Sequence, residues 1–266
     1  MTKKKSFSLI LLIATICILF SSAVYADVKK PVVRWTKKGG YDYCYVDGKK
    51  KKNGIFEIDG KSYYFDKKGR QLTGWRKIGK KAYFFRNARG KNGYMEKGKK
   101  VDGIKLNKNG QAVPNTGRAK KKLPILIKCR KIVDKLTFPA MKEKEKLRSC
   151  FDYVNTHFNS NYVPDLSREK NWDLVYAEKM LELGYGDCYS HAVTFAYLAH
   201  AAGSKNVQCI HNGGHSWVKI GKRYYDPHWE RCVGVSCFAV SKSGAGKYGR
   251  PYWPGESPQY IKKCSK

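Results

Sequence analysis

Acidic residues are scarce in this chain. Its 266 residues contain 21 aspartates and glutamates against 54 lysines and arginines, so the formal net charge is +33 at pH 7. This charge excludes an ordinary neutral cytosolic enzyme and favours anionic partners, because a strong positive field concentrates anions near the protein. The excess is greatest in the first half, which carries lysine clusters at residues 49–52, 97–100 and 120–122.

Long hydrophobic runs are also few. The run at residues 7–20 follows Lys3, Lys4 and Lys5 and precedes a stretch of small residues that ends at Ala26. It is shorter than the roughly 20 residues that span a bilayer, and this order of segments is typical of an export signal. We therefore expect residues 1–26 to be a signal peptide cleaved after Ala26. The mature protein would be secreted and extracellular, with no membrane span, and its export argues against nucleic acid as a partner.

Cysteine, by contrast, is plentiful. The chain has nine cysteines, and removal of Cys17 with the signal leaves eight. Exported cysteines usually form disulfides, but a free catalytic cysteine would leave at least one other unpaired. The cysteines and histidines do not have the spacing of a zinc site, so no metal or other cofactor is expected. The pattern favours a disulfide among four residues near the C-terminus: Cys209, Cys232, Cys237 and Cys264.

The first half has an internal repeat. The hydrophobic fraction of 42% and aromatic fraction of 14% exclude a disordered chain. Trp35, Ile55 and Trp75 recur every 20 residues, with aromatic clusters between them. Asp59-Gly60 and Gly79-Lys80 are suited to tight hairpin turns. A fixed period of this kind predicts a solenoid of β-hairpins over residues 27–115.

The unit G-I-F-E-I-D-G-K-S-Y-Y-F-D-K-K-G at residues 54–69 resembles the choline-binding and glucan-binding type cell-wall repeats of Gram-positive bacteria. The resemblance implies that the hairpins bind the cell wall through aromatic boxes. Ile55 and Ile104 replace the tryptophan of the family pattern, which disfavours choline, because a quaternary ammonium needs a cage of aromatic rings. Teichoic acid or peptidoglycan would suit the basic clusters. Six rings are wall-binding candidates, or alternatively solenoid core: Trp35, Tyr63, Tyr64, Trp75, Tyr83 and Phe84.

The pattern becomes helical after a basic segment at residues 116–122, which we expect to be a linker. Apolar spacing predicts helices over residues 125–136, 144–158 and 172–183. We expect residues 123–266 to form a second domain, which makes the protein a mixed α+β chain.

Cys188 stands at the start of another predicted helix. Asp187 is a plausible N-cap, an apolar run covers residues 188–201, and Gly203 ends it. The free N–H groups and dipole of a helix N-terminus favour a thiolate. Cys188 is therefore a candidate nucleophile.

The next segments predict a β-hairpin that turns at Gly221-Lys222. A two-residue loop there pairs positions whose numbers sum to 443, so that Trp217 faces Asp226. His215 is then the diagonal neighbour of Asp226 on the same face, within about 7–8 Å. An acid in that place can orient an imidazole.

The order G-D-C, H-S-W-V and Y-Y-D-P resembles the transglutaminase-like superfamily. The resemblance implies a papain-like domain with a helix packed on an antiparallel sheet. The Cys188 thiolate would attack an amide carbonyl of a peptide or protein, His215 would transfer the proton and Asp226 would fix its tautomer. The Cys188 N–H is the natural oxyanion donor, with Tyr185 and Trp172 as further candidates.

These patterns predict an exported, cell-wall-associated cysteine enzyme that acts by acyl transfer through a thioester, as peptidase, amidase or transamidase. Two alternatives stay open. One is an NlpC-like peptidoglycan hydrolase, which also pairs a helix-start cysteine with a strand histidine. The other is a wall-binding adhesion protein whose second domain is catalytically inactive.

Overall fold

The structure is a computed structural model that describes residues 30–163, 171–211, 214–241 and 259–260. The expected signal peptide and Cys264 lie outside the described residues. The described residues from Val33 onward form one compact unit. No helix in the described ranges is long and apolar enough to cross a membrane.

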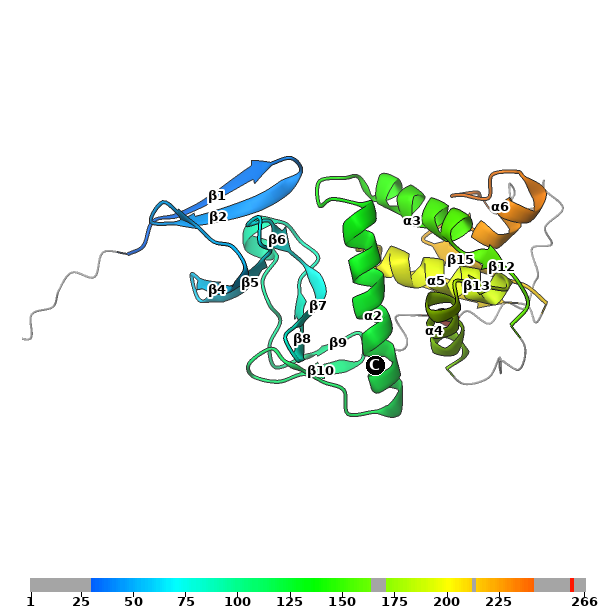
Figure 1. The fold of residues 1–266 in the computed structure, drawn as a ribbon, viewed down its shortest axis with the longest axis horizontal. Coiled ribbons are helices and arrows are strands. Elements are labelled where there is room, and N and C mark those ends of the chain that lie inside the picture. Colours follow the sequence, from blue (N-terminus) through cyan, green and yellow to red (C-terminus); the bar gives the residue numbers. More distant parts are fainter. Residues whose placement is uncertain (1–29, 164–170, 212–213, 242–258, 261–266) are drawn as a thin grey trace, which may run out of the picture. The chain divides into compact units, whose positions relative to one another are not determined.

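The first part consists of successive antiparallel hairpins, as the repeat predicts (Figure 1). Three of the four carry a short third strand. The strands are β1 (Val33–Lys38), β2 (Tyr41–Val46), β3 (Lys49–Lys50), β4 (Gly54–Ile58), β5 (Lys61–Phe65), β6 (Gln71–Leu72), β7 (Gly74–Ile78), β8 (Lys81–Phe85), β9 (Lys100–Val101), β10 (Ile104–Leu106) and β11 (Ala112–Val113).

Both predicted hairpin turns are confirmed. Ile58 pairs with Lys61 and Ile78 with Lys81, which leaves Asp59-Gly60 and Gly79-Lys80 as two-residue loops. Asp59 and Gly60 have φ angles of 50° and 69°. Positive φ at both central positions is the geometry that matches the twist of the flanking strands.

Helix α2 (Gly117–Leu136) corrects the expected linker at residues 116–122. Thr116 caps the helix by accepting a hydrogen bond from Ala119 N at 3.1 Å, and the basic residues form its first turns. Lys122 is 1% exposed and lies among the buried residues of the helix. A lysine stem packs as an apolar group, so a basic run can begin a buried helix.

The remaining helices surround one central helix. The predictions for α3 (Glu143–His157), α4 (Trp172–Leu183) and α5 (Cys188–Ala201) are confirmed within one residue at each end. Helix α5 is largely apolar and buried along almost its whole length. It packs against α2, α3 and α4 and against strands β14 (Val207–His211) and β15 (Ser216–Ile220) (Figure 1). A helix with this composition is stable only inside a core.

The sheet beside α5 is antiparallel, with strand order β16-β15-β14-β17. It completes the mixed α+β fold. Its strands are β14 (Val207–His211), β15 (Ser216–Ile220), β16 (Arg223–Tyr225) and β17 (Gln259–Tyr260). The other elements of this part are the two-residue strands β12 (Asn159–Ser160) and β13 (Tyr185–Gly186) and the short helix α6 (Pro227–Val233).

Ion pairs join the third hairpin to helix α2. Arg76 of β7 and Arg130 of α2 both bind the carboxylate of Asp134, with Arg130 Nη2 at 2.6 Å. Arg130 also donates to the carbonyl of Ala201 at the end of α5, at 2.7 Å. Burial alone would raise the pKa of Asp134, but the two guanidiniums outweigh it and lower this pKa.

Asp134→Ala is expected to destabilise the protein by about 2–3 kcal/mol. The substitution leaves two guanidiniums without their acid, and the loss is smaller than the roughly 3–5 kcal/mol of a fully buried pair, because Asp134 is 27% exposed. Because the pKa of Asp134 is lowered, its contribution is present above the ordinary pKa of about 3.9 and is lost at lower pH. Urea unfolding at pH 7 measures the effect. Lys135→Ala, on the exposed face of the same helix, is the control, and equal stabilities of the two variants would contradict the prediction.

Candidate active site

Cys188 is the first residue of helix α5. The side chain of Asp187 caps the helix by accepting a hydrogen bond from Ser190 N at 3.0 Å. The first N–H groups of a helix have no intrahelical acceptor. The backbone N–H of Cys188 is one of these groups, so an oxyanion could accept a hydrogen bond from it. The thiol is free and half-buried. A nucleophile needs this combination of access and positive electrostatic environment.

The hairpin of β15 and β16 has the register that the sequence predicts. Ile220 pairs with Arg223 and Val218 with Tyr225. His215 lies directly before β15 and Asp226 directly after β16, one residue beyond the strand ends where we expected them. Both residues are therefore at the same end of the hairpin, and the predicted contact between them is present.

Asp226 holds the imidazole of His215. The distance from His215 Nε2 to Asp226 Oδ2 is 2.7 Å, and the carboxylate is 4% exposed. The other oxygen, Oδ1, accepts a hydrogen bond from Trp229 N at 2.9 Å and so caps helix α6. The carboxylate is thus fixed by a helix while it orients the histidine.

His215 also contacts Cys188. Burial lowers the pKa of His215, but hydrogen bonds to Asp226 and Cys188 outweigh it and raise the pKa to about 9. Because Nε2 bonds Asp226, Nδ1 is the ring nitrogen left for the thiol. The structure therefore brings the three predicted residues together in the order cysteine, histidine, aspartate.

Aromatic and imidazole rings surround His215. Its ring centroid lies 6.0 Å from that of Trp217, 5.9 Å from that of Trp229 and 6.2 Å from that of His228. His228 Nε2 lies 2.8 Å from Ser160 Oγ. Burial, with the neighbouring His191 and other charges, lowers the pKa of His228 to about 4. A neutral ring at this place adds no positive charge beside the His215 imidazolium.

Several of these neighbours could not be read from the sequence. For His228, the sequence shows only that it follows Asp226 by two positions. No sequence pattern points to Ser160. It lies at the site because β12 pairs in parallel with β13, and each of these strands has only two residues. His191 is fully buried on α5, and its Nδ1 lies 2.9 Å from the carbonyl of Asp187.

The two further oxyanion candidates lie in different environments. Trp172 begins helix α4 and is 1% exposed, and its Nε1 has no hydrogen-bond partner among the described residues. Tyr185 is half-buried in β13, where it pairs with Asn159. Their role stays a prediction.

Among the described residues, no disulfide joins Cys209, Cys232 and Cys237 to one another, and Cys264 lies outside the described residues. Cys209 and Cys237 are buried, whereas Cys232 is exposed on α6. Within the described ranges, no group of three or more histidine, cysteine or acidic side chains fits a metal ion.

The six wall-binding candidates differ in how far they are buried. Tyr63 and Trp75 are 2% and 4% exposed, and Trp75 Nε1 donates to Asp102 Oδ2 at 2.7 Å, so both rings pack inside the protein. Trp35 lies edge-on to Tyr63 with a centroid distance of 5.0 Å. The half-buried rings are Trp35, Tyr64, Tyr83 and Phe84.

Two family models match this chain. Residues 130–221 match the transglutaminase-like superfamily, and residues 52–91 match the choline-binding repeat. The first match indicates a cysteine enzyme and the second indicates association with the cell wall. No curated protein matches the chain.

Solved choline-binding proteins are similar to about a third of the chain. The choline-binding domain of Spr1274 from Streptococcus pneumoniae is 27% identical, and the match covers 32% of this chain and 98% of that one, with a TM-score of 0.26. Choline-binding protein F from the same species, in the presence of a peptidoglycan analogue, is 25% identical over 31% and 26% of the two chains, with a TM-score of 0.27. The cell-wall endolysin of phage Cp-1, complexed with choline, is 28% identical over 32% and 25%, with a TM-score of 0.28. The chain therefore spans about a quarter of the length of the last two.

Proposed function

We propose that this protein is an exported, cell-wall-associated cysteine enzyme that transfers an acyl group from an amide, through a thioester, to water or to an amine. The observation that supports it is the position of His215, whose Nε2 bonds Asp226 at 2.7 Å and whose pKa is raised by Asp226 and by the neighbouring Cys188. The second ring nitrogen of a histidine held in this way is directed to the nucleophile.

In the first half-reaction the Cys188 thiol gives its proton to His215 and the sulfur attacks the amide carbonyl carbon. The C=O electron pair moves to oxygen, and the N–H of Cys188 at the start of α5 is placed to stabilise the oxyanion. When the C–N bond breaks, the imidazolium of His215 protonates the leaving amine. The products are a thioester on Cys188 and a free amine.

In the second half-reaction His215, now neutral, takes a proton from water or from a second amine. The acceptor attacks the thioester carbonyl, the C–S bond breaks, and the sulfur leaves as thiolate. Water gives a carboxylic acid and an amine gives a new amide. Asp226 stays ionised throughout and stabilises the imidazolium whenever it forms.

The hairpins are the proposed cell-wall contact. Trp35, Tyr64 and Tyr83 offer partly exposed aromatic surface. Another half-buried ring of the hairpins, Tyr43, has the ammonium of Lys50 over it, with Nζ 4.4 Å from the ring centroid. Aromatic rings with neighbouring cations suit an anionic wall polymer such as teichoic acid or peptidoglycan. Binding there would keep the enzyme at the amides of the cell surface.

Trapping of the acyl-enzyme tests this proposal. The protein is incubated with Gram-positive peptidoglycan, and separately with a protein rich in glutamine, in the presence of hydroxylamine. We expect a hydroxamate to accumulate. In a parallel sample without hydroxylamine, quenched with acid, we expect mass spectrometry to find the acyl adduct on the peptide that contains Cys188. Hydroxamate that forms with the adduct on another residue, or no hydroxamate with any amide substrate, would overturn the proposal.

A further inference from the structure

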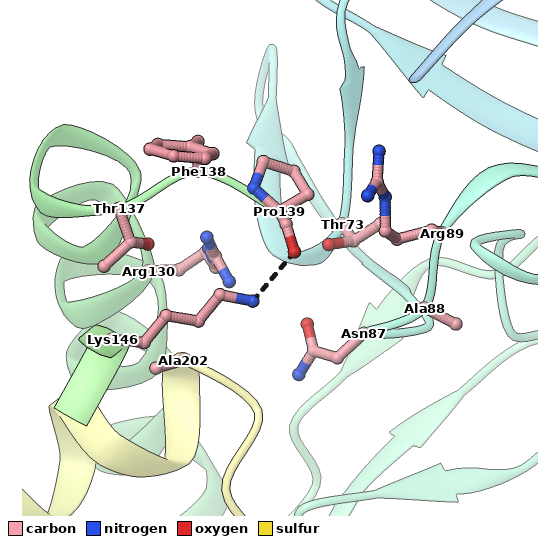
Figure 2. Close-up of a pocket in the computed structure, with 10 residues that line it drawn as sticks. All are labelled: Thr73, Asn87, Ala88, Arg89, Arg130, Thr137, Phe138, Pro139, Lys146 and Ala202. Atoms are coloured by element: carbon pink, nitrogen blue, oxygen red, sulfur yellow. Dashed lines mark hydrogen bonds between the residues drawn. The ribbon is translucent and has the colours of Figure 1, made fainter. Parts of the chain in front are cut away.

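A polar cavity lies where the third hairpin meets three helices (Figure 2). It has a volume of about 70 Å³. One water needs only about 10–15 Å³, so this cavity has room for a polyatomic ion. Its lining residues come from the segments around β7 and β8, from α2 and the loop after it, from α3 and from the end of α5, and Cys188, His215 and Asp226 are not among them.

The side chain of Lys146 lines this cavity. Its Nζ donates to the carbonyl of Pro139 at 3.0 Å, and within the described part of the chain no carboxylate forms a salt bridge with it. Burial lowers the pKa of Lys146, and the positive charges of Arg130 and Arg89 lower it further. A cation in this position is unfavourable unless an anion joins it.

The neighbouring acids are already engaged. Asp134 is shared between Arg76 and Arg130, and Asp42 binds Arg89 at 2.8 Å. Glu143, whose charge acts on Lys146, is exposed, and its carboxylate accepts a hydrogen bond from Ser204 Oγ at 2.8 Å. The cations around the cavity therefore exceed the carboxylates that bind them.

Hydrogen-bond donors that lack acceptors face the same space. Figure 2 shows Lys146 and Asn87 extending toward each other from opposite sides of the cavity. The side chains of Asn87 and Thr73 make no hydrogen bond with the described residues. Lys146 has three N–H donors and Arg130 has five, and their bonds to Pro139, Asp134 and Ala201 leave donors free on both.

We infer that this cavity is a binding site for a phosphate group, with Lys146, Arg130 and Asn87 as its donors. A tetrahedral oxyanion accepts several N–H bonds at once, and charge-assisted bonds to its oxygens are strong. Asn87 is exposed, so the phosphate group can enter either as a free ion or as a phosphodiester within a longer polymer. The site depends neither on the catalytic residues nor on the aromatic rings of the hairpins.

Thermal unfolding of the full chain, with inorganic phosphate titrated against chloride at constant ionic strength, tests the site. We expect phosphate to raise the midpoint, and Lys146→Gln to weaken its apparent affinity at least tenfold. Lys144→Gln is the matched control, since it removes the same charge from an exposed position of α3. Equal phosphate responses of the two variants would overturn the inference.

A second measurement needs no variant. Acetic anhydride is added to the unmodified protein, and mass spectrometry follows acetylation at Lys146 and at Lys144. We expect inorganic phosphate to slow acetylation of Lys146 several-fold and to leave Lys144 unchanged. Glycerophosphoglycerol, a phosphodiester, is the second probe. Protection by both compounds indicates a polymer phosphodiester as the ligand, protection by inorganic phosphate alone indicates the free ion, and protection by neither contradicts the site.

Discussion

Cys188→Ala is expected to lower amide turnover by about 10⁴- to 10⁶-fold. The substitution removes the atom that forms the thioester, whereas the helix N-terminus and the bound substrate can supply only the remaining catalysis. Hydroxamate formation from the substrate found by acyl trapping measures the loss. The half-buried thiol makes no disulfide, so the fold and the binding to isolated cell walls should be those of the parent protein.

The matched control is Cys232→Ala, which removes an exposed thiol from helix α6. It should retain the turnover of the parent. Unchanged turnover in Cys188→Ala would contradict the proposed enzyme. If no substrate is found and Cys188 resists alkylation while the walls are still bound, the alternative of a catalytically inactive wall-binding protein gains support.

Much of the fold follows from local sequence signals. Helix α5 could be bounded to the residue because an acidic cap, an unbroken apolar run and a glycine mark its limits. The same logic failed for α2, whose first turns are so basic that they resemble a linker. Nothing local shows that Lys122 lies among buried residues, because its burial depends on elements that pack from elsewhere in the chain.

The candidate binding and catalytic residues also include some whose contacts follow from the sequence and some whose contacts do not. His215 and Asp226 could be paired in advance because a two-residue turn fixes the register of a hairpin, and that register is present. Trp75, in contrast, follows the repeat pattern of a wall-binding ring, yet its indole bonds Asp102 and its ring packs inside the protein. That hydrogen bond joins residues 27 positions apart, and no periodicity predicts it.

Asp226→Asn is expected to lower turnover by roughly 10²- to 10⁴-fold and to change its pH dependence. The asparagine keeps an oxygen for Trp229 N but loses the negative charge that helps raise the pKa of His215 to about 9. The raised pKa keeps the imidazolium, which protonates the leaving amine, populated up to about pH 9. The alkaline limb of the rate profile should therefore lie near pH 9 in the parent and at lower pH in the variant.

Alkylation by iodoacetamide checks the same pair without a substrate. In the parent, Cys188 should already be alkylated at pH 6, because proton transfer to His215 leaves a nucleophilic thiolate. Asp226→Asn stabilises the imidazolium less, so labelling at pH 6 should slow at least tenfold, and His215→Ala should slow it further. Asp152→Asn, which removes a partly exposed carboxylate from α3, is the control with the same change of charge. Equal labelling rates in all four proteins would show that Asp226 and His215 do not activate the thiol, even if Cys188 itself proves essential.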